Sequence, residues 1–184
     1  METDVLRLEV DRRLAPWFSH LGGDRTAYTN HVLRVIRLCD LLGERAGLDF
    51  VPSDREEFCT AVAFHDLGVW SANTFDYLAP SEQLAVDWLR EHAREDLIPL
   101  VTTMIDDHHK LRPAADPADP VELLRRADAI DVEMAVLGRF GVRRGDYRAL
   151  VAEFPEAGFH LRLLQFGAKR LRTHPLSPLP MIKW

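Results

Sequence analysis

The feature that most constrains the fold is an apolar stripe with helical spacing that ends on the dipeptide His65-Asp66. Phe58, Ala61, Val62 and His65 are spaced i, i+3, i+4 and i+7, which is the repeat of one face of an α-helix. An ionisable pair on such a face is costly to bury unless it is paired or bound to a metal. The stripe alone also fits a core histidine with satisfied hydrogen bonds, so a site can be inferred only if further ligands are found.

Further histidines stand at the same kind of position elsewhere in the chain. His92 ends one apolar stripe, and the pair His108-His109 ends two neighbouring stripes of another segment. His31 borders the inward stripe of a longer segment, where it is either a boundary residue or a ligand. Isolated core histidines are not expected to recur at stripe ends this often, so the pattern favours a shared site.

Two carboxylates add to this set. Asp128 and Asp131 stand in the middle of a predicted helix beside apolar residues, where a carboxylate is rarely left unpaired. Each could instead form an ion pair with Arg125 or Arg126. Imidazoles and carboxylates together are the ligand set of iron, manganese, nickel, cobalt or zinc, so the sequence predicts one or two divalent metal ions.

The fold class follows from the same periodicity. No alternating strand pattern, internal repeat or glycine-rich phosphate loop is evident, and the chain is predicted to be an all-α bundle of about six to eight helices. The predicted helices cover residues 6–18, 26–46, 53–67, 81–93, 96–110, 119–139, 147–154 and 161–172.

Composition excludes several classes of function. A net charge of −6 argues against a broad nucleic-acid surface, which needs a basic footprint. No apolar run approaches the roughly 20 residues that span a bilayer, and the acidic start is unlike a signal peptide, so a cytoplasmic protein without membrane contact is expected. Cys39 and Cys59 lie among apolar residues and are expected to be buried thiols.

A loop over residues 68–80 leaves directly from the His-Asp turn and is rich in aromatic residues. Gly68 is the expected end of the preceding helix. Trp70, Phe75 and Tyr77 either form the lid or wall of a pocket or simply cover the edge of the core.

The order His31, His65-Asp66 and Asp128 resembles the H…HD…D signature of the HD-domain superfamily of metal-dependent phosphohydrolases. The resemblance implies that these four residues hold one metal ion around a bundle of core helices. A metal ion with an open coordination position lowers the pKa of a bound water, toward ~7 in the best cases.

The extent of the resemblance suggests one HD domain over residues 1–184. The signature covers about residues 26–138, and residues 139–184 form a C-terminal helical extension with an irregular tail.

Superfamily members with two metals have additional histidines between the HD pair and the final aspartate. His92, His108 and His109 occupy those places, with Asp66 as the expected bridge between the ions. Asp131 has no counterpart in the signature and is expected to orient a ligand histidine or to act as a base.

The remaining predicted site residues are basic. Lys110, Arg34 and Arg126 are candidates for binding substrate phosphate, although each could be an ordinary surface charge. Asp66, Asp131 and Lys110 are the predicted catalytic residues.

The function that the resemblance favours is hydrolysis of a small phosphorylated metabolite or nucleotide. The alternatives are a di-iron HD-type oxygenase, a hydratase-like hydrolase of a small nitrogen compound, and a non-enzymatic, metal-stabilised regulatory domain. A small-molecule substrate is expected, and the sequence predicts neither an oligomeric state nor a partner protein.

Overall fold

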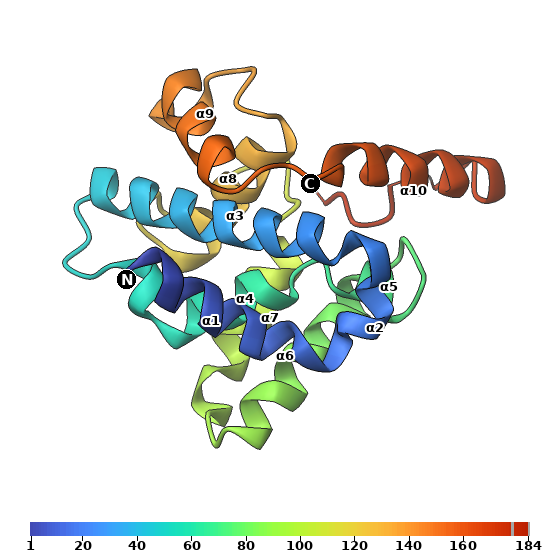
Figure 1. Cartoon of the computed structure of the whole chain (residues 1–184), viewed down its shortest axis with the longest axis horizontal. Coiled ribbons are helices and arrows are strands. Elements are labelled where there is room, and N and C mark those ends of the chain that lie inside the picture. Colours follow the sequence, from blue (N-terminus) through green and yellow to red (C-terminus); the bar gives the residue numbers. More distant parts are fainter. Residues whose placement is uncertain (178, 184) are drawn as a thin grey trace.

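The computed structural model describes residues 1–177 and 179–183, and the helices in this part of the chain pack around a long central helix, α3 (Figure 1). The predicted all-α fold is confirmed: over the described residues there is no strand, only an isolated bridge between Lys110 and Lys183. The α-helices are α1 (Thr3–Leu14), α2 (Phe18–Leu21), α3 (Arg25–Ala46), α4 (Glu56–Phe64), α5 (Gly68–Ser71), α6 (Leu78–Glu91), α7 (Ile98–Asp107), α8 (Pro120–Val132), α9 (Arg144–Glu153) and α10 (Phe159–Thr173).

The core forms where α3 packs against α8, α4 and α1. The predicted inward stripe of α3 is fully buried, including Val32, Val35 and Ile36. The helix ends as predicted at Gly47, which has a positive φ of 76° that glycine adopts without steric cost. Cys39 and Cys59 are buried free thiols, also as predicted.

The start of α8 agrees with its sequence signals. Asp119 caps the helix, because its Oδ1 accepts a hydrogen bond of 2.8 Å from the backbone N–H of Val121. Pro120 occupies the first helical turn, where a backbone N–H would have no acceptor within the helix, so proline loses no hydrogen bond there. This cap fixes the helix that carries both candidate aspartates.

The end of α4 differs from the prediction. The helix ends at Phe64, and Gly68 begins the short helix α5 instead of ending the preceding one. A Cβ on Gly68 would lie 2.4 Å from the carbonyl oxygen of Tyr77 and 2.8 Å from the Oγ of Ser81. Glycine is therefore required here by the close approach of the following segment and not by a helix stop.

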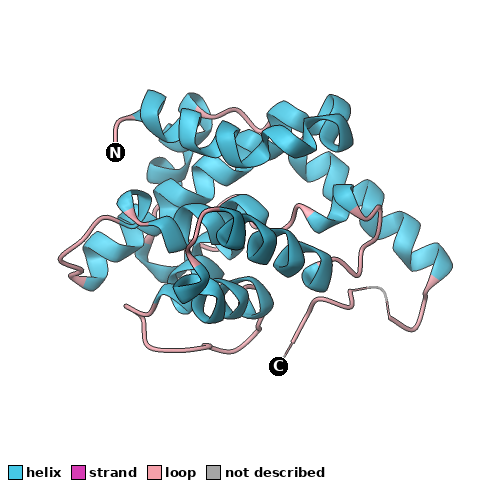
Figure 2. Ribbon diagram, turned by 90° about the horizontal axis from the view of Figure 1, so that it is seen from below, coloured by secondary structure: helices cyan, strands magenta, loops and turns pink. Residues whose placement is uncertain are grey.

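The C-terminal part of the chain lies beside the end of the bundle. Helix α10 begins next to α3 and extends outward, and the segment after it turns back along the helix (Figures 1 and 2). The returning tail is held by a 2.9 Å hydrogen bond from the Leu111 N–H to the Lys183 carbonyl oxygen and by an ion pair between Lys183 and Asp106. Among the described helices, none is both long and apolar enough to cross a membrane.

Candidate metal centre

Four residues of the predicted set converge at the centre of the bundle. His31 comes from the middle of α3, His65 and Asp66 from the turn after α4, and Asp128 from α8. All four are buried, and each offers a ligand atom within 4.8 Å of those of the others.

The two histidines of this group face each other through their Nε2 atoms. The Nδ1–H of His65 donates to the carbonyl oxygen of Val62 at 2.8 Å, and the Nδ1–H of His31 donates to Asp131 at 2.7 Å. In the neutral rings both Nε2 atoms then carry lone pairs, although they lie only 3.0 Å apart. Two acceptors facing each other at this distance fit a shared cation.

The carboxylates also fit a metal. The Oδ1 atoms of Asp66 and Asp128 are buried without a hydrogen-bond partner among the described residues. An unpaired buried carboxylate oxygen is costly, and bound metal ions are one of the few ways to compensate it. His31, His65, Asp66 and Asp128 would therefore hold one divalent ion.

A second group adjoins the first through Asp66. Its other members are His108 and His109, with ligand atoms again within 4.8 Å of one another. The Nδ1–H of His108 donates to the carbonyl oxygen of Ile105 at 2.6 Å, so its Nε2 is left unprotonated, 3.5 Å from Asp66 Oδ1. In His109 the Nε2 lies 2.6 Å from the Tyr77 hydroxyl, and the Nδ1 faces Asp128 Oδ2 at 3.7 Å.

The electrostatics of the cluster reflect its mixed charges. Burial opposes a charge on His65, but the Asp66 and Asp128 carboxylates outweigh it and raise the pKa of this imidazole to about 9. Burial opposes ionisation of Asp66, yet His65 and His108 hold the pKa of its carboxyl well below the usual range. Burial and the neighbouring His108 lower the pKa of His109 to about 4.

Comparison with known proteins identifies the family. The family model of the HD domain matches residues 28–133, more than half of the chain and all the residues of the cluster. The chain belongs to the HD-domain family. The HD-domain superfamily consists in general of metal-dependent hydrolases. Membership in it supports the assignment of the His/Asp cluster as a metal centre. Searches among curated proteins and among solved structures gave no match.

His92, predicted as a ligand of the second ion, lies outside the HD-domain cluster. Helix α6 ends at Glu91, so His92 follows the last helical residue and is exposed. Its ring stacks on Trp88 and its Nδ1–H donates to the Trp88 carbonyl oxygen at 2.8 Å. We therefore withdraw His92 from the ligand set.

Asp131 orients a ligand and is not placed to act as a base. One of its oxygens accepts from Arg34 Nε at 2.6 Å, and the other accepts from His31 Nδ1 and Arg34 Nη2. Arg34, predicted to bind phosphate, is fully buried and also donates to the Phe154 carbonyl oxygen. The predictions of Asp131 as a base and of Arg34 as a phosphate-binding residue are corrected, because these two groups neutralise each other behind His31.

The other predicted phosphate-binding residues have different surroundings. Arg126 pairs with Glu122 at 2.7 Å, lies over the ring of Phe140 and lines neither cavity at the cluster. Lys110 pairs with Asp107 at 2.8 Å, but it also lines a small cavity beside the cluster. Lys110 alone of the three stays a candidate.

The sequence did not indicate three further neighbours of the HD-domain centre. Phe159, the first residue of α10, stacks on His31 with ring centroids 4.0 Å apart. His160 donates from Nε2 to the Asp131 carbonyl oxygen at 2.9 Å. Tyr77 was expected only as part of a lid or of the core edge, and its hydrogen bond to His109 was not anticipated.

Two cavities open beside the cluster and share His109, Val132 and Ile182. The smaller, of about 170 Å³, includes His108, Asp128, Lys110, Arg125, Glu133 and Arg139 in its lining. Each of its three cations is paired with an acidic residue: Lys110 with Asp107, Arg125 with Glu122 and Arg139 with Glu133. A phosphoryl group bound there would share these cations with the carboxylates. The larger, of about 660 Å³, reaches Asp66 and is otherwise mainly apolar.

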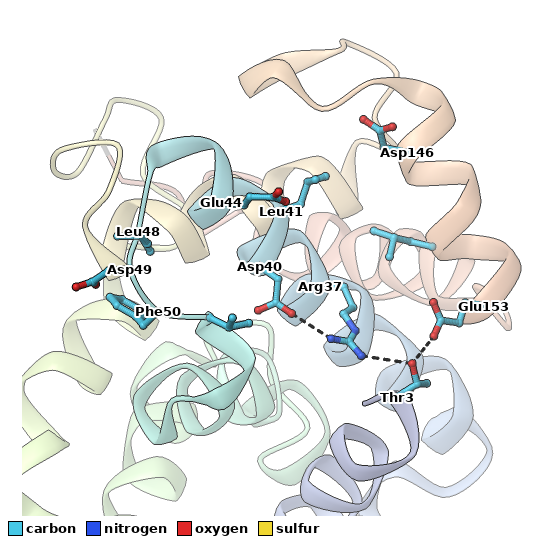
Figure 3. Close-up of a pocket in the computed structure, with 12 residues that line it drawn as sticks. Thr3, Arg37, Asp40, Leu41, Glu44, Leu48, Asp49, Phe50, Asp146 and Glu153 are labelled. Carbon is cyan, nitrogen blue, oxygen red and sulfur yellow. Dashed lines mark hydrogen bonds and ion pairs between the residues drawn. The ribbon is translucent and has the colours of Figure 1, made fainter. Parts of the chain in front are cut away.

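A third cavity, of about 700 Å³, lies at the far end of α3 and contains none of the cluster residues (Figure 3). There Arg37 pairs with Asp40 and donates to the Thr3 hydroxyl, which donates to Glu153. It is not a candidate for the active site, because none of the residues that could hold a metal ion lines it.

Proposed function

We propose that this HD-domain protein hydrolyses a phosphate monoester of a small molecule at the centre formed by His31, His65, Asp66 and Asp128. The observation that carries the proposal is the small cavity, where Lys110, Arg125 and Arg139 line the space next to Asp128 and His109. Cations beside a carboxylate-rich metal centre are suited to hold the oxygens of a phosphoryl group.

A bound divalent ion would supply a water of lowered pKa and polarise a phosphoryl oxygen. In the hydrolysis, the water oxygen forms a bond to phosphorus and the ester P–O bond breaks. The alcohol leaves with a proton and inorganic phosphate remains, so the reaction needs no oxidant or reductant. Lys110 and Arg139 would offset the charge that develops on the phosphoryl oxygens.

The test is release of phosphate from p-nitrophenyl phosphate, with iron, manganese, nickel, cobalt or zinc supplied singly to metal-free protein. We expect turnover with at least one ion, and a rise of about tenfold or more in KM for Lys110→Ala. The matched control is Lys169→Ala, because Lys169 is exposed on α10 and lines neither cavity at the cluster. Absence of phosphate release with every ion would refute the proposal.

A second candidate is the di-iron oxygenase, because the adjoining group of Asp66, His108 and His109 offers a second ion a place beside the first, as it also would in a two-metal phosphatase. In that case, protein purified without added metal should hold two irons and absorb visible light as ferric protein. It should also consume O₂ with an organic substrate and be inert toward phosphate esters. Two irons together with phosphate release would favour the phosphatase.

A further inference from the structure

The larger cavity at the metal centre is almost entirely apolar. Its lining includes Val69, Phe75, Leu163 and Met181, together with Asp66 at its inner end. None of the described residues that line it is a lysine or an arginine. Away from its inner end at the metal centre, an anionic group in this cavity would be desolvated without a compensating cation, which is unfavourable.

We infer that the substrate is an amphiphile: its phosphate lies at the small cationic cavity, and a bulky uncharged apolar group fills the larger cavity. This rests on the proposed function, because the metal centre fixes where the reacting group must lie. The two cavities meet at His109, Val132 and Ile182, so one molecule can occupy both.

The size of the larger cavity fits such a group. A volume of about 660 Å³ lies within the roughly 300–1,000 Å³ range of small-molecule sites, which are mostly apolar with few polar groups. Its polar groups are Asp66, Tyr77, His109 and His160. Tyr77 and His109 are already bonded to each other, and the Nε2 of His160 is bonded to the Asp131 carbonyl oxygen. Apart from Asp66 at the metal centre, the His160 Nδ1, which faces Glu156 at 3.2 Å, is then the main group left to recognise a sugar or a base by hydrogen bonds.

The outer wall consists of α10 and the returning tail. Several apolar side chains of this wall and of the opposite rim are exposed to solvent, namely Met134, Leu164, Leu179 and Ile182. Exposed apolar residues around a cavity mouth are typical of a binding site, because an apolar ligand covers them. The apolar surface is therefore continuous from solvent to Asp66.

Gly167 provides a way to fill this cavity. It lines the cavity, and a Cβ at this position would meet no other atom within 4 Å. Gly167→Leu adds an isobutyl group at a position that lines the cavity and has room for a Cβ, and leucine is also a better helix former than glycine. The matched control is Gly145→Leu in α9, where a Cβ also meets nothing and no cavity at the cluster is near.

The first experiment measures binding of the uncharged fluorescent probe N-phenyl-1-naphthylamine to metal-free protein and needs no catalysis. We expect the probe to bind wild type and Gly145→Leu equally and Gly167→Leu at least tenfold more weakly. Equal binding to wild type and Gly167→Leu, or no binding to wild type, would overturn the inference.

The second experiment compares kcat/KM for 1-naphthyl phosphate and phenyl phosphate in metal-loaded protein. We expect wild type to prefer the larger ester and Gly167→Leu to lose that preference while still hydrolysing phenyl phosphate. If the probe binds as expected but no ester is hydrolysed, the apolar site stands and the proposed phosphatase function fails. If both esters are hydrolysed equally well by wild type, the assignment of the cavity to the substrate is wrong.

Discussion

Asp131 fixes the ring of His31: its Oδ2 accepts the Nδ1–H of this histidine at 2.7 Å while Arg34 donates to both of its oxygens. All three side chains are fully buried. Burial opposes ionisation of Asp131, but His31 and Arg34 hold the pKa of its carboxyl far below the usual range. The carboxylate thus stays charged and keeps the Nε2 lone pair of His31 directed at the centre.

Replacing this carboxylate should weaken metal binding without removing a ligand. For Asp131→Asn we expect a loss of about 10- to 100-fold in metal affinity, measured by competition with a chelator. The matched control is Asp87→Asn, because the Asp87 side chain is about half exposed on α6. Thermal unfolding of the metal-free variants would separate lost affinity from lost stability, and unchanged affinity in folded Asp131→Asn would contradict the assigned role.

Metal stoichiometry should follow the two ligand groups. Asp66→Ala removes the residue that both groups share, so binding at both places should be lost. His108→Ala should reduce a two-ion protein to one ion, because His108 belongs only to the second group.

His92→Ala is the matched histidine control, and elemental analysis of the purified variants is the measurement. His92 also bonds to a backbone carbonyl oxygen but lies outside both groups. A change in metal content in His92→Ala would show that our ligand assignment is wrong.

Gly68→Ala should destabilise the protein and disturb the second ligand group. The added Cβ would meet the Tyr77 carbonyl oxygen at 2.4 Å, so the segment that carries Tyr77 must shift. We expect a loss of about 1–3 kcal/mol in the free energy of unfolding, measured by denaturant titration. Gly145→Ala is the control, and it should be neutral or slightly stabilising. Equal stability of the two variants would exclude the close contact.

Acid stability should depend on Glu122. This buried carboxylate pairs with Arg125 and Arg126 and accepts the Ala114 N–H. Burial opposes its ionisation, but the two arginines and the N–H lower its pKa to about 2. A lowered pKa stabilises the fold above the unfolded value of 4.5, and this contribution is lost as the pH falls toward about 2.

We therefore expect Glu122→Gln to lose about 3 kcal/mol of stability at pH 7 and to show a weaker decline between pH 4.5 and 2. Denaturant titrations across this pH range are the measurement. Glu91→Gln, at an exposed glutamate, is the control and should follow wild type. A Glu122→Gln curve parallel to that of wild type would contradict the prediction.

Local pattern marked only some members of the central group, and the set of His31, His65, Asp66 and Asp128 was expected from the resemblance to the HD-domain signature. These four residues lie together in the structure. His65 and His108 end apolar helical stripes, and in the structure each ring bonds back to the carbonyl oxygen three residues earlier. The same rule failed for His92. All three histidines follow the last residue of their helix, but the backbone stays in the right-handed helical region at His65 and His108 and leaves it at His92 (φ −103°, ψ 11°). Periodicity does not specify how a helix end continues to that accuracy.

The remaining surroundings of the centre could not be predicted, since they depend on long-range packing. Phe159 contacts His31 across more than a hundred residues of chain, and no local pattern indicates where α10 docks. The pairing of Arg34 with Asp131 likewise depends on how α3 meets α8. The position of Arg34 in the sequence placed it near the site. Only the packing shows that Asp131 neutralises its charge, so that it is not free to bind substrate.

The stacking of Phe159 on His31 connects the metal centre to α10 through one direct side-chain contact. The aromatic ring that begins α10 lies flat against an imidazole whose orientation a bound ion would fix. Metal binding should therefore stabilise the packing of the first turn of α10 against α3, and removal of the metal by a chelator should weaken it. Protease cleavage between α9 and α10 would then report, in a simple gel assay, whether the centre is filled.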